Sequence, residues 1–223
     1  MSVGVAPRVR GRRLLFRLGR VEVHSYKAML YLGCVLGIYA SAPVAAHKGM
    51  DVGTFCLIVV ALLVPAFAGS RVLYVVRHRR SYRVRPSQVA TRSDGGAALF
   101  GGLLLSVATS VALLPAAGLP FLAFWDAASV TMLVGLAITR LGCLMNGCCG
   151  GRPTSGWLGM WAPDVQGRWE RRVPTQVLEA GWAALILVGV VVGGNVLQAD
   201  GAVFVVVVAT YCAGRVAFHA MRA

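Results

Sequence analysis

The sequence predicts an all-α membrane protein, a polytopic bundle of about six transmembrane helices. Of its 223 residues, 57% are hydrophobic and only 13% are charged, and the mean hydropathy is +0.71. Soluble domains normally carry about 25% charged residues. The Lys and Arg residues, which give a formal net charge of +14, lie in short segments between long apolar runs. That distribution is typical of basic loops beside anionic lipid and argues against nucleic acid as a partner.

Six apolar runs approach or exceed the roughly 20 residues that a spanning helix needs. In chain order they cover residues 28–46, 53–76, 95–117, 121–141, 176–197 and 202–221. They lack the period-two alternation of a barrel strand. The first run follows basic residues, as in a signal peptide, but its charged leader is long and the residues around Cys34 make a poor cleavage site.

The runs divide the chain into a basic N-terminal segment, 1–27, and a single transmembrane domain, 28–223. The longest extramembrane piece is a head segment at about 142–175, whose Trp157, Trp161 and Trp169 suit the membrane–water interface. With six spans, the N-terminus, residues 77–94, residues 140–175 and the C-terminus lie on one side. That side holds nearly all Lys and Arg, so the positive-inside rule places it in the cytoplasm.

Charged side chains inside the apolar runs are candidates for function, because burying charge in a membrane is costly. Snorkelling at helix ends is the alternative for any single residue. It weakens for five charges in six helices, several of which must face a shared interior. The five are Arg71, Asp126, Arg140, Glu179 and Arg215.

The last run contains TYCAGRVAFH, in which Tyr211, Arg215 and His219 are spaced four apart and share one helical face. The guanidinium fork of arginine suits a phosphate. With Arg140 and Arg152, Arg215 therefore predicts a pocket for a phospholipid head group.

Small residues concentrate after the fourth run, in GCLMNGCCGGRPT. Glycines there allow a tight turn that brings backbone N–H groups near an anion, and Gly101 and Gly102 allow another backbone to approach the third run. Adjacent cysteines without a second pair fit a zinc site poorly, so no metal and no cofactor is predicted. A disulfide in an oxidising compartment and small-residue filler remain open for Cys143, Cys148 and Cys149.

Six segments together resemble the prolipoprotein diacylglyceryl transferase family of bacterial inner-membrane enzymes. In chain order they read VHSYKAMLYLG, AGSRVLYVV, DGGAALFGGLLL, TRLGCLMNGCCGGRP, RRVPTQVLEA and TYCAGRVAFHAMR. The fourth follows the family signature, which runs Gly-Arg, Gly-Asn, Asn-Gly and Gly-Arg. The order and spacing of the segments, which extend over most of the chain, are more specific than any one of them.

The resemblance implies a multi-pass protein of the bacterial inner membrane, in contact with membrane lipid. It would transfer a diacylglyceryl group from phosphatidylglycerol to the lipobox thiol of a prolipoprotein and release glycerol phosphate. The arginines would bind the phosphate, and the tyrosines would orient the lipid or the peptide. The catalytic residues predicted are Arg140, Arg215, Tyr26, Tyr211 and His219. The substrate-binding residues predicted are Gly101, Gly102, Asn146, Gly151, Arg152, Arg71, Gln176 and Glu179.

The chain departs from the family where protons are handled. Phe100 stands in place of a family histidine, so His219 or His24 would have to act as the base. Two further hypotheses follow: a non-catalytic lipid-binding paralogue, and a membrane thiol-redox protein that uses the three clustered cysteines. The family also works on the outer face and usually has a seventh span, so membrane orientation stays open. The other departures are at Cys143, Cys148, Val173 and His219.

Overall fold

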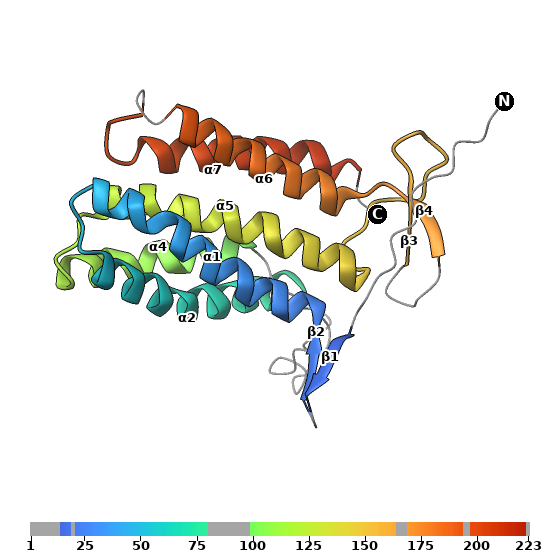
Figure 1. Cartoon of the computed structure of the whole chain (residues 1–223), viewed down its shortest axis with the longest axis horizontal. Helices are drawn as coiled ribbons and strands as arrows, with labels where there is room; N and C mark the ends of the chain where they lie inside the picture. Colours follow the sequence, from blue (N-terminus) through green and yellow to red (C-terminus); the bar gives the residue numbers. More distant parts are fainter. Residues whose placement is uncertain (1–13, 19–20, 80–98, 164–168, 194–196, 222–223) are drawn as a thin grey trace. The chain divides into compact units, whose positions relative to one another are not determined.

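The computed structural model of the chain describes residues 14–18, 21–79, 99–163, 169–193 and 197–221, and within them it is helical as predicted (Figure 1). Five described helices are long and apolar enough to cross a membrane, and the apolar part of a sixth, α4, is shorter. The helices are α1 (Ser25–His47), α2 (Val52–Arg77), α4 (Leu99–Ala116), α5 (Phe121–Asn146), α6 (Thr175–Val192) and α7 (Ala202–His219).

The helix bounds follow the predicted runs, with two differences. Helix α5 continues to Asn146, past the predicted end at 141, because the apolar character persists until Gly147 turns the chain. Helix α6 ends at Val192, where Gly193 follows as its C-cap. Residues 95–98, the predicted start of the third run, lie outside the described residues.

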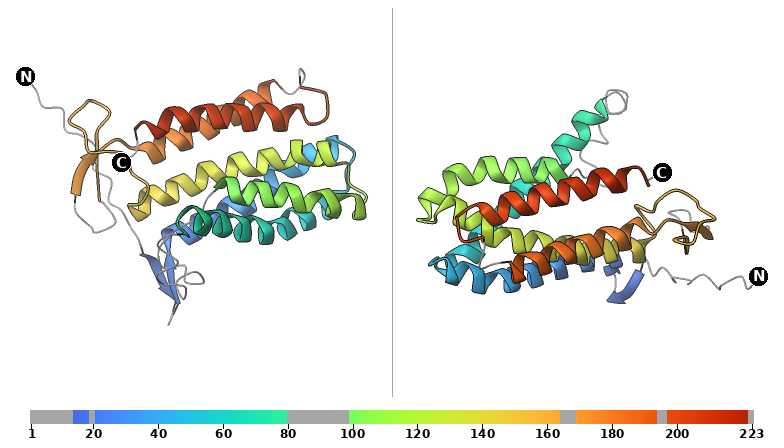
Figure 2. Two further views of the ribbon diagram at one scale, coloured as in Figure 1. Left: turned by 180° about the vertical axis from the view of Figure 1, so that it is seen from behind. Right: turned by 90° about the horizontal axis from the view of Figure 1, so that it is seen from above.

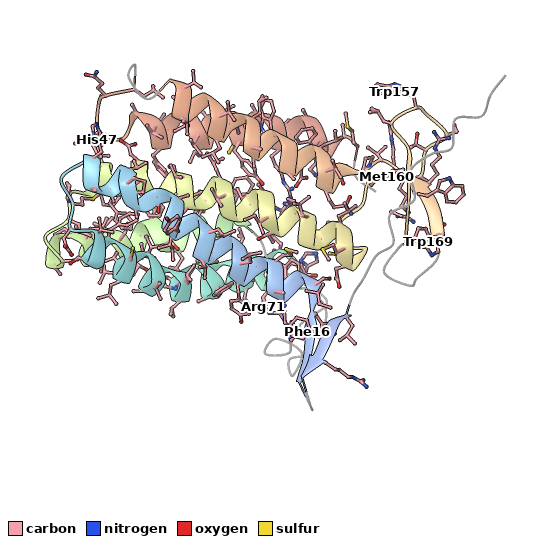
Figure 3. All side chains as sticks on the ribbon, viewed as in Figure 1. Phe16, His47, Arg71, Trp157, Met160 and Trp169 are labelled. Atoms are coloured by element: carbon pink, nitrogen blue, oxygen red, sulfur yellow. The ribbon has the colours of Figure 1, made fainter. Side chains whose placement is uncertain are left out.

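Two short hairpins were not predicted. Strand β1 (Leu14–Leu18) pairs antiparallel with β2 (Val21–His24), which leads directly into α1. Strand β3 (Met160–Pro163) pairs antiparallel with β4 (Trp169–Arg172) inside the head segment. Figure 3 labels Trp157 and Trp169 on this segment, where both indole side chains are exposed.

The described residues belong to two compact units, which are considered separately. Unit 1 comprises Met1–Ser41 and Trp125–Ala223, and unit 2 comprises Ala42–Phe124.

Unit 2 is built on the packing of α2 against α4. A Cβ added to Gly69 would collide with the carbonyl oxygen of Gly101, one added to Gly101 would collide with that of Gly69, and one on Gly102 would lie 2.6 Å from the oxygen of Ala66. The close backbone approach predicted at Gly101 and Gly102 is therefore present. Asp51 caps α2 by accepting the Thr54 N–H at 2.7 Å, and this hydrogen bond lowers the pKa of the Asp51 carboxyl.

In unit 1, α5 contacts α1 on one face and a separate core cluster on another. Towards α1, Gly37 is so close to α5 that an added Cβ would lie 2.7 Å from the carbonyl oxygen of Thr131. The Thr131 hydroxyl also donates to the Ser41 hydroxyl at 2.8 Å, a bond between helices that suits an apolar surrounding. The core cluster combines Leu133 of α5 with Ala183, Ile186, Val203, Val207 and Tyr211 of α6 and α7, which lie side by side (Figure 2).

The four helices of unit 1 alternate in direction, so four chain segments meet at one end, which we call the head end. There α1 begins beside the last turns of α5, since a Cβ on Gly142 would lie 3.5 Å from the Tyr26 Cα. There too α6 begins, and the Arg152 N–H donates to the Met221 carbonyl just after α7. The described part of the N-terminal segment, the head segment and the end of α7 thus share one end of unit 1.

Candidate functional site

A buried carboxylate joins two arginines of unit 1, in the turns of α5, α6 and α7 nearest the head end. Glu179 of α6 is 2% exposed, and its Oε2 lies 2.6 Å from Nε of Arg140 of α5. The same carboxylate accepts from one terminal nitrogen of Arg215 of α7 at 2.8 and 2.9 Å. A guanidinium has five N–H donors in a fixed fork, so each arginine has donors beyond those used here. One negative charge thus orients two positive charges, and the network carries a net charge of +1.

Two tyrosines lie beside this network. The Tyr211 hydroxyl is buried and has no hydrogen-bond partner within 3.5 Å among the described residues, although it is close enough to the Arg140 guanidinium to interact with it. Tyr26, at the start of α1, is within electrostatic range of Arg140. It is also within electrostatic range of three cysteines at and beyond the end of α5, which are Cys143, Cys148 and Cys149. A buried hydroxyl without a partner costs free energy, roughly 1–3 kcal/mol by mutational data. Tyr211 therefore offers a donor that a bound polar group would satisfy.

The chain leaves α5 through a Schellman cap. The Gly147 N–H donates to the Leu144 carbonyl and the Cys148 N–H to the Cys143 carbonyl, both at 3.1 Å, and Gly147 has φ +71°. Two residues later Cys149 adopts φ +61°, the left-handed conformation that side chains other than glycine seldom take. The turn predicted from the glycines is present, and it folds the loop back toward α6.

Side chains at the start of α6 fasten this loop. The Gln176 amide donates to the Cys148 carbonyl at 2.7 Å, and the Thr175 hydroxyl donates to the Cys149 carbonyl at 2.9 Å. Gly151 is enclosed: a Cβ there would lie 2.7 Å from the Met221 carbonyl oxygen and 2.8 Å from that of Val173. A role for Thr175 was not predicted from the sequence. Its position beside Gln176, at the start of the predicted helix, could have indicated one.

All six cysteines lie in the described part of the chain and are thiols. Sγ atoms of Cys143, Cys148 and Cys149 lie within 4.8 Å of one another, with Cys143 buried and Cys149 exposed. The hydrogen-bonded contact with Cys143 favours the Cys148 thiolate, but the Cys149 thiol and burial outweigh it and raise the pKa of Cys148.

Asp126 was predicted as a charge inside the membrane and as a candidate for function. In the structure its carboxylate caps the start of α7. The side chain is fully buried in α5, and its two oxygens each accept a backbone N–H at 2.9 Å, from Gly201 and from Phe204 at the start of α7. Gly201 has no side chain with which to cap α7, so a carboxylate from another helix satisfies these donors.

The structure gathers part of the predicted site. Arg140, Glu179 and Arg215 form the network, and Tyr211 and Tyr26 lie within electrostatic range of Arg140. Asn146 ends α5, and Gln176 and Gly151 hold the loop that follows.

Other predicted residues are not members of this network. His219 is exposed in the last turn of α7, and Arg152 is exposed in the head segment. Arg71, whose guanidinium lies 5.7 Å from the Tyr74 ring centroid, belongs to unit 2 with Gly101 and Gly102. Figure 3 labels Arg71.

The apolar helices and the arginine–carboxylate network define a multi-pass membrane protein with charged side chains paired among its helices. Residues 13–223 match the model of the prolipoprotein diacylglyceryl transferase family, and the chain belongs to that family. The family resemblance seen in the six sequence segments is thereby confirmed. The family consists of membrane transferases in lipoprotein biosynthesis.

Individual relatives cover nearly the whole chain. It is 28% identical over 221 residues to the phosphatidylglycerol–prolipoprotein diacylglyceryl transferase of Bacillus licheniformis, a match over 94% of this chain and 80% of the relative. It is 26% identical over 219 residues to the protein of the same description from Shouchella clausii, over 94% and 78% of the two chains. A third relative, from Bacillus mycoides, is 30% identical over 66% of this chain and 53% of its own.

Proposed function

We propose that this protein transfers the diacylglyceryl group of phosphatidylglycerol to a cysteine thiol of a prolipoprotein. The thiol sulfur forms a bond to the glycerol carbon, the bond from that carbon to the phosphate oxygen breaks, and glycerol phosphate leaves with the electron pair. The thiol proton goes to a base. The observation that carries the proposal is the Arg140–Glu179–Arg215 network, in which a buried carboxylate pairs with two partly buried guanidiniums among apolar helices.

The network suits a leaving phosphate. Negative charge grows on the phosphate oxygens as the carbon–oxygen bond breaks, and preorganised guanidinium donors stabilise it best where water is excluded. Glu179 holds the two arginines at a fixed separation and neutralises one of them, so they need no reorganisation when the lipid arrives. The Tyr211 hydroxyl, which is buried and has no hydrogen-bond partner within 3.5 Å in the described part of the chain, would donate to the same anion.

The transfer also needs a base for the thiol proton. His219 is the candidate, one helical turn beyond Arg215, and its imidazole is exposed. Phe100 replaces the family histidine, and its ring is 40% exposed. That substitution favours a second candidate function, a lipid-binding protein that uses the same arginines without transferring the lipid.

A mass-shift assay separates the two. The purified chain is incubated with phosphatidylglycerol and a peptide that carries a lipobox cysteine. We expect a diacylglyceryl-peptide, and a rate about 100-fold or more lower in Arg140→Ala, since removing one such donor costs that much in other enzymes. Arg79→Ala, at an exposed position beyond α2, serves as the matched charge control.

Each outcome has a distinct meaning. Adduct formed by the wild type and by Arg79→Ala, but not by Arg140→Ala, supports the transferase. Saturable phosphatidylglycerol binding that needs Arg140, without adduct, supports the lipid-binding function. Absence of both would overturn the proposal.

A further inference from the structure

The three cysteines after α5 form a group that the proposed transfer does not use. Cys143, Cys148 and Cys149 have Sγ atoms within 4.8 Å of one another. Thiolates that share one metal ion are separated by a somewhat smaller distance, since zinc–sulfur bonds are about 2.3 Å long. Small side-chain movements would bring all three sulfurs to one ion.

The helix cap explains why residues five apart meet. In a Schellman motif the residue two beyond the helix end packs against the third residue from that end. Here those positions are Cys148 and Cys143, and the Cys148 Sγ lies 3.7 Å from the Cys143 carbonyl oxygen. Cys149 reaches the same place only because its backbone takes φ +61°. Glycine would adopt that conformation at no steric cost. A cysteine at this position therefore indicates a role for its side chain.

The surroundings hold the group in place and compensate its charge. Thr175 and Gln176 anchor the carbonyls of Cys149 and Cys148, so the loop is fixed from α6. Arg140 lies within electrostatic range of Cys143 and would offset the negative charge of a metal-bound thiolate. Exposure rises from Cys143 to Cys149, which leaves one open side for an ion to enter.

We propose that Cys143, Cys148 and Cys149 bind one thiophilic cation with a filled d shell, such as Cu(I) or Zn²⁺, through three thiolates. Soft thiolate ligands select such ions. In the described residues the group offers no fourth His, Cys, Asp or Glu ligand. Cu(I) would therefore take three sulfur ligands, and Zn²⁺ would add a water. The thiols give up their protons as the metal binds. The sequence spacing argued against a metal because it contains no second cysteine pair, but the cap and the left-handed residue supply a third ligand instead.

The test uses the whole chain, reduced and free of oxygen, in detergent micelles. It is titrated with Cu(I) or Zn²⁺ against a competing chelator, and the ligands are identified by X-ray absorption. We expect one ion per chain with three sulfur neighbours, and an upward shift of the thermal unfolding midpoint on binding. Failure of both ions to bind, or binding through fewer than three sulfurs, would overturn the proposal. So would a disulfide among the three in protein isolated without reductant.

The decisive variant is Cys149→Gly, because glycine suits φ +61° and the metal-free protein should unfold no more easily than the wild type. It should lose the bound ion at metal concentrations that saturate the wild type. A triple variant of the cysteines inside apolar helices, Cys34→Ser/Cys56→Ser/Cys212→Ser, should keep it. Retention of the ion by Cys149→Gly, with its sulfur count unchanged, would refute the site.

Discussion

Glu179 is the residue on which the site depends, because its single carboxylate pairs with two arginines from different helices. Both of its oxygens are used, one by Arg140 and both by Arg215, and the side chain is almost fully buried. A buried ion pair adds little when compared with a well-packed apolar replacement, but removing one partner leaves a charge that has lost its solvent and its counter-ion.

We predict that Glu179→Gln lowers the free energy of unfolding by about 3–5 kcal/mol, the usual cost of breaking a buried pair. The amide keeps the shape of the side chain but leaves two guanidiniums with no negative partner between them. Chemical unfolding in one detergent, followed by helix content, measures the difference.

The matched control is Glu170→Gln in the head segment. Its carboxylate accepts from Arg172 Nε at 2.9 Å, and its side chain is 38% exposed. Exposed pairs contribute about 0–1 kcal/mol, so this variant should unfold almost like the wild type. Equal effects of the two substitutions would show that the buried network contributes no more than a surface pair.

At the scale of helices, the start of α7 depends on α5. Gly201 precedes the helix with φ +86° and supplies no capping side chain, and Asp126 accepts the Gly201 and Phe204 N–H groups instead. The carboxylate is therefore both a helix cap and a link between two helices.

We predict that Asp126→Ala destabilises unit 1 by about 1–3 kcal/mol, because two buried N–H groups lose their acceptor. Amide hydrogen exchange should increase first at the N-terminal turn of α7, where the donors are left unpaired. Asp51→Ala removes an exposed cap from α2 and should have a smaller effect, since water replaces the lost acceptor. An unchanged exchange pattern in α7 after Asp126→Ala would contradict this account.

The same contacts show which parts of the fold the sequence can predict. Helices were predictable because long apolar runs in a membrane have few alternatives to the helix. The end of α5 and the capping of α7 were not, because the first depends on the left-handed Gly147 and the second on a residue 75 positions away. The hairpins were missed because strands of four or five residues give too little alternation to detect.

The chemical type of the charged residues predicted that they belong to a functional site, but the sequence did not predict how these residues contact one another. Arg140, Glu179 and Arg215 stood out because charge is costly in a membrane, yet nothing in their spacing showed that one carboxylate serves both arginines. The cysteines were harder still, because a three-dimensional cap brings together thiols whose spacing matches no familiar metal motif.

At the scale of the whole molecule, the question is which side of the membrane the head end faces. Outside the apolar runs, every Lys and Arg except Lys48 falls in a segment predicted on the side of the head, and the positive-inside rule places such a side in the cytoplasm. The family resemblance implies the outer face. Both views require that the head segment and the turn between α6 and α7 lie on opposite sides, because α6 and α7 each run the length of unit 1.

We predict opposite labelling of two single cysteines placed in a background without the native ones. Trp157→Cys lies in the exposed head segment, and Asp200→Cys lies in the turn before α7. A membrane-impermeant maleimide should label one of them in intact cells and the other only in inside-out vesicles. Labelling of both from one side would contradict the alternation of helices in unit 1. If Trp157→Cys reacts from outside, the proposed transfer would take place on the face where translocated proteins emerge. If it reacts from inside, the positive charge has set the orientation, and the acceptor thiol must come from the cytoplasm.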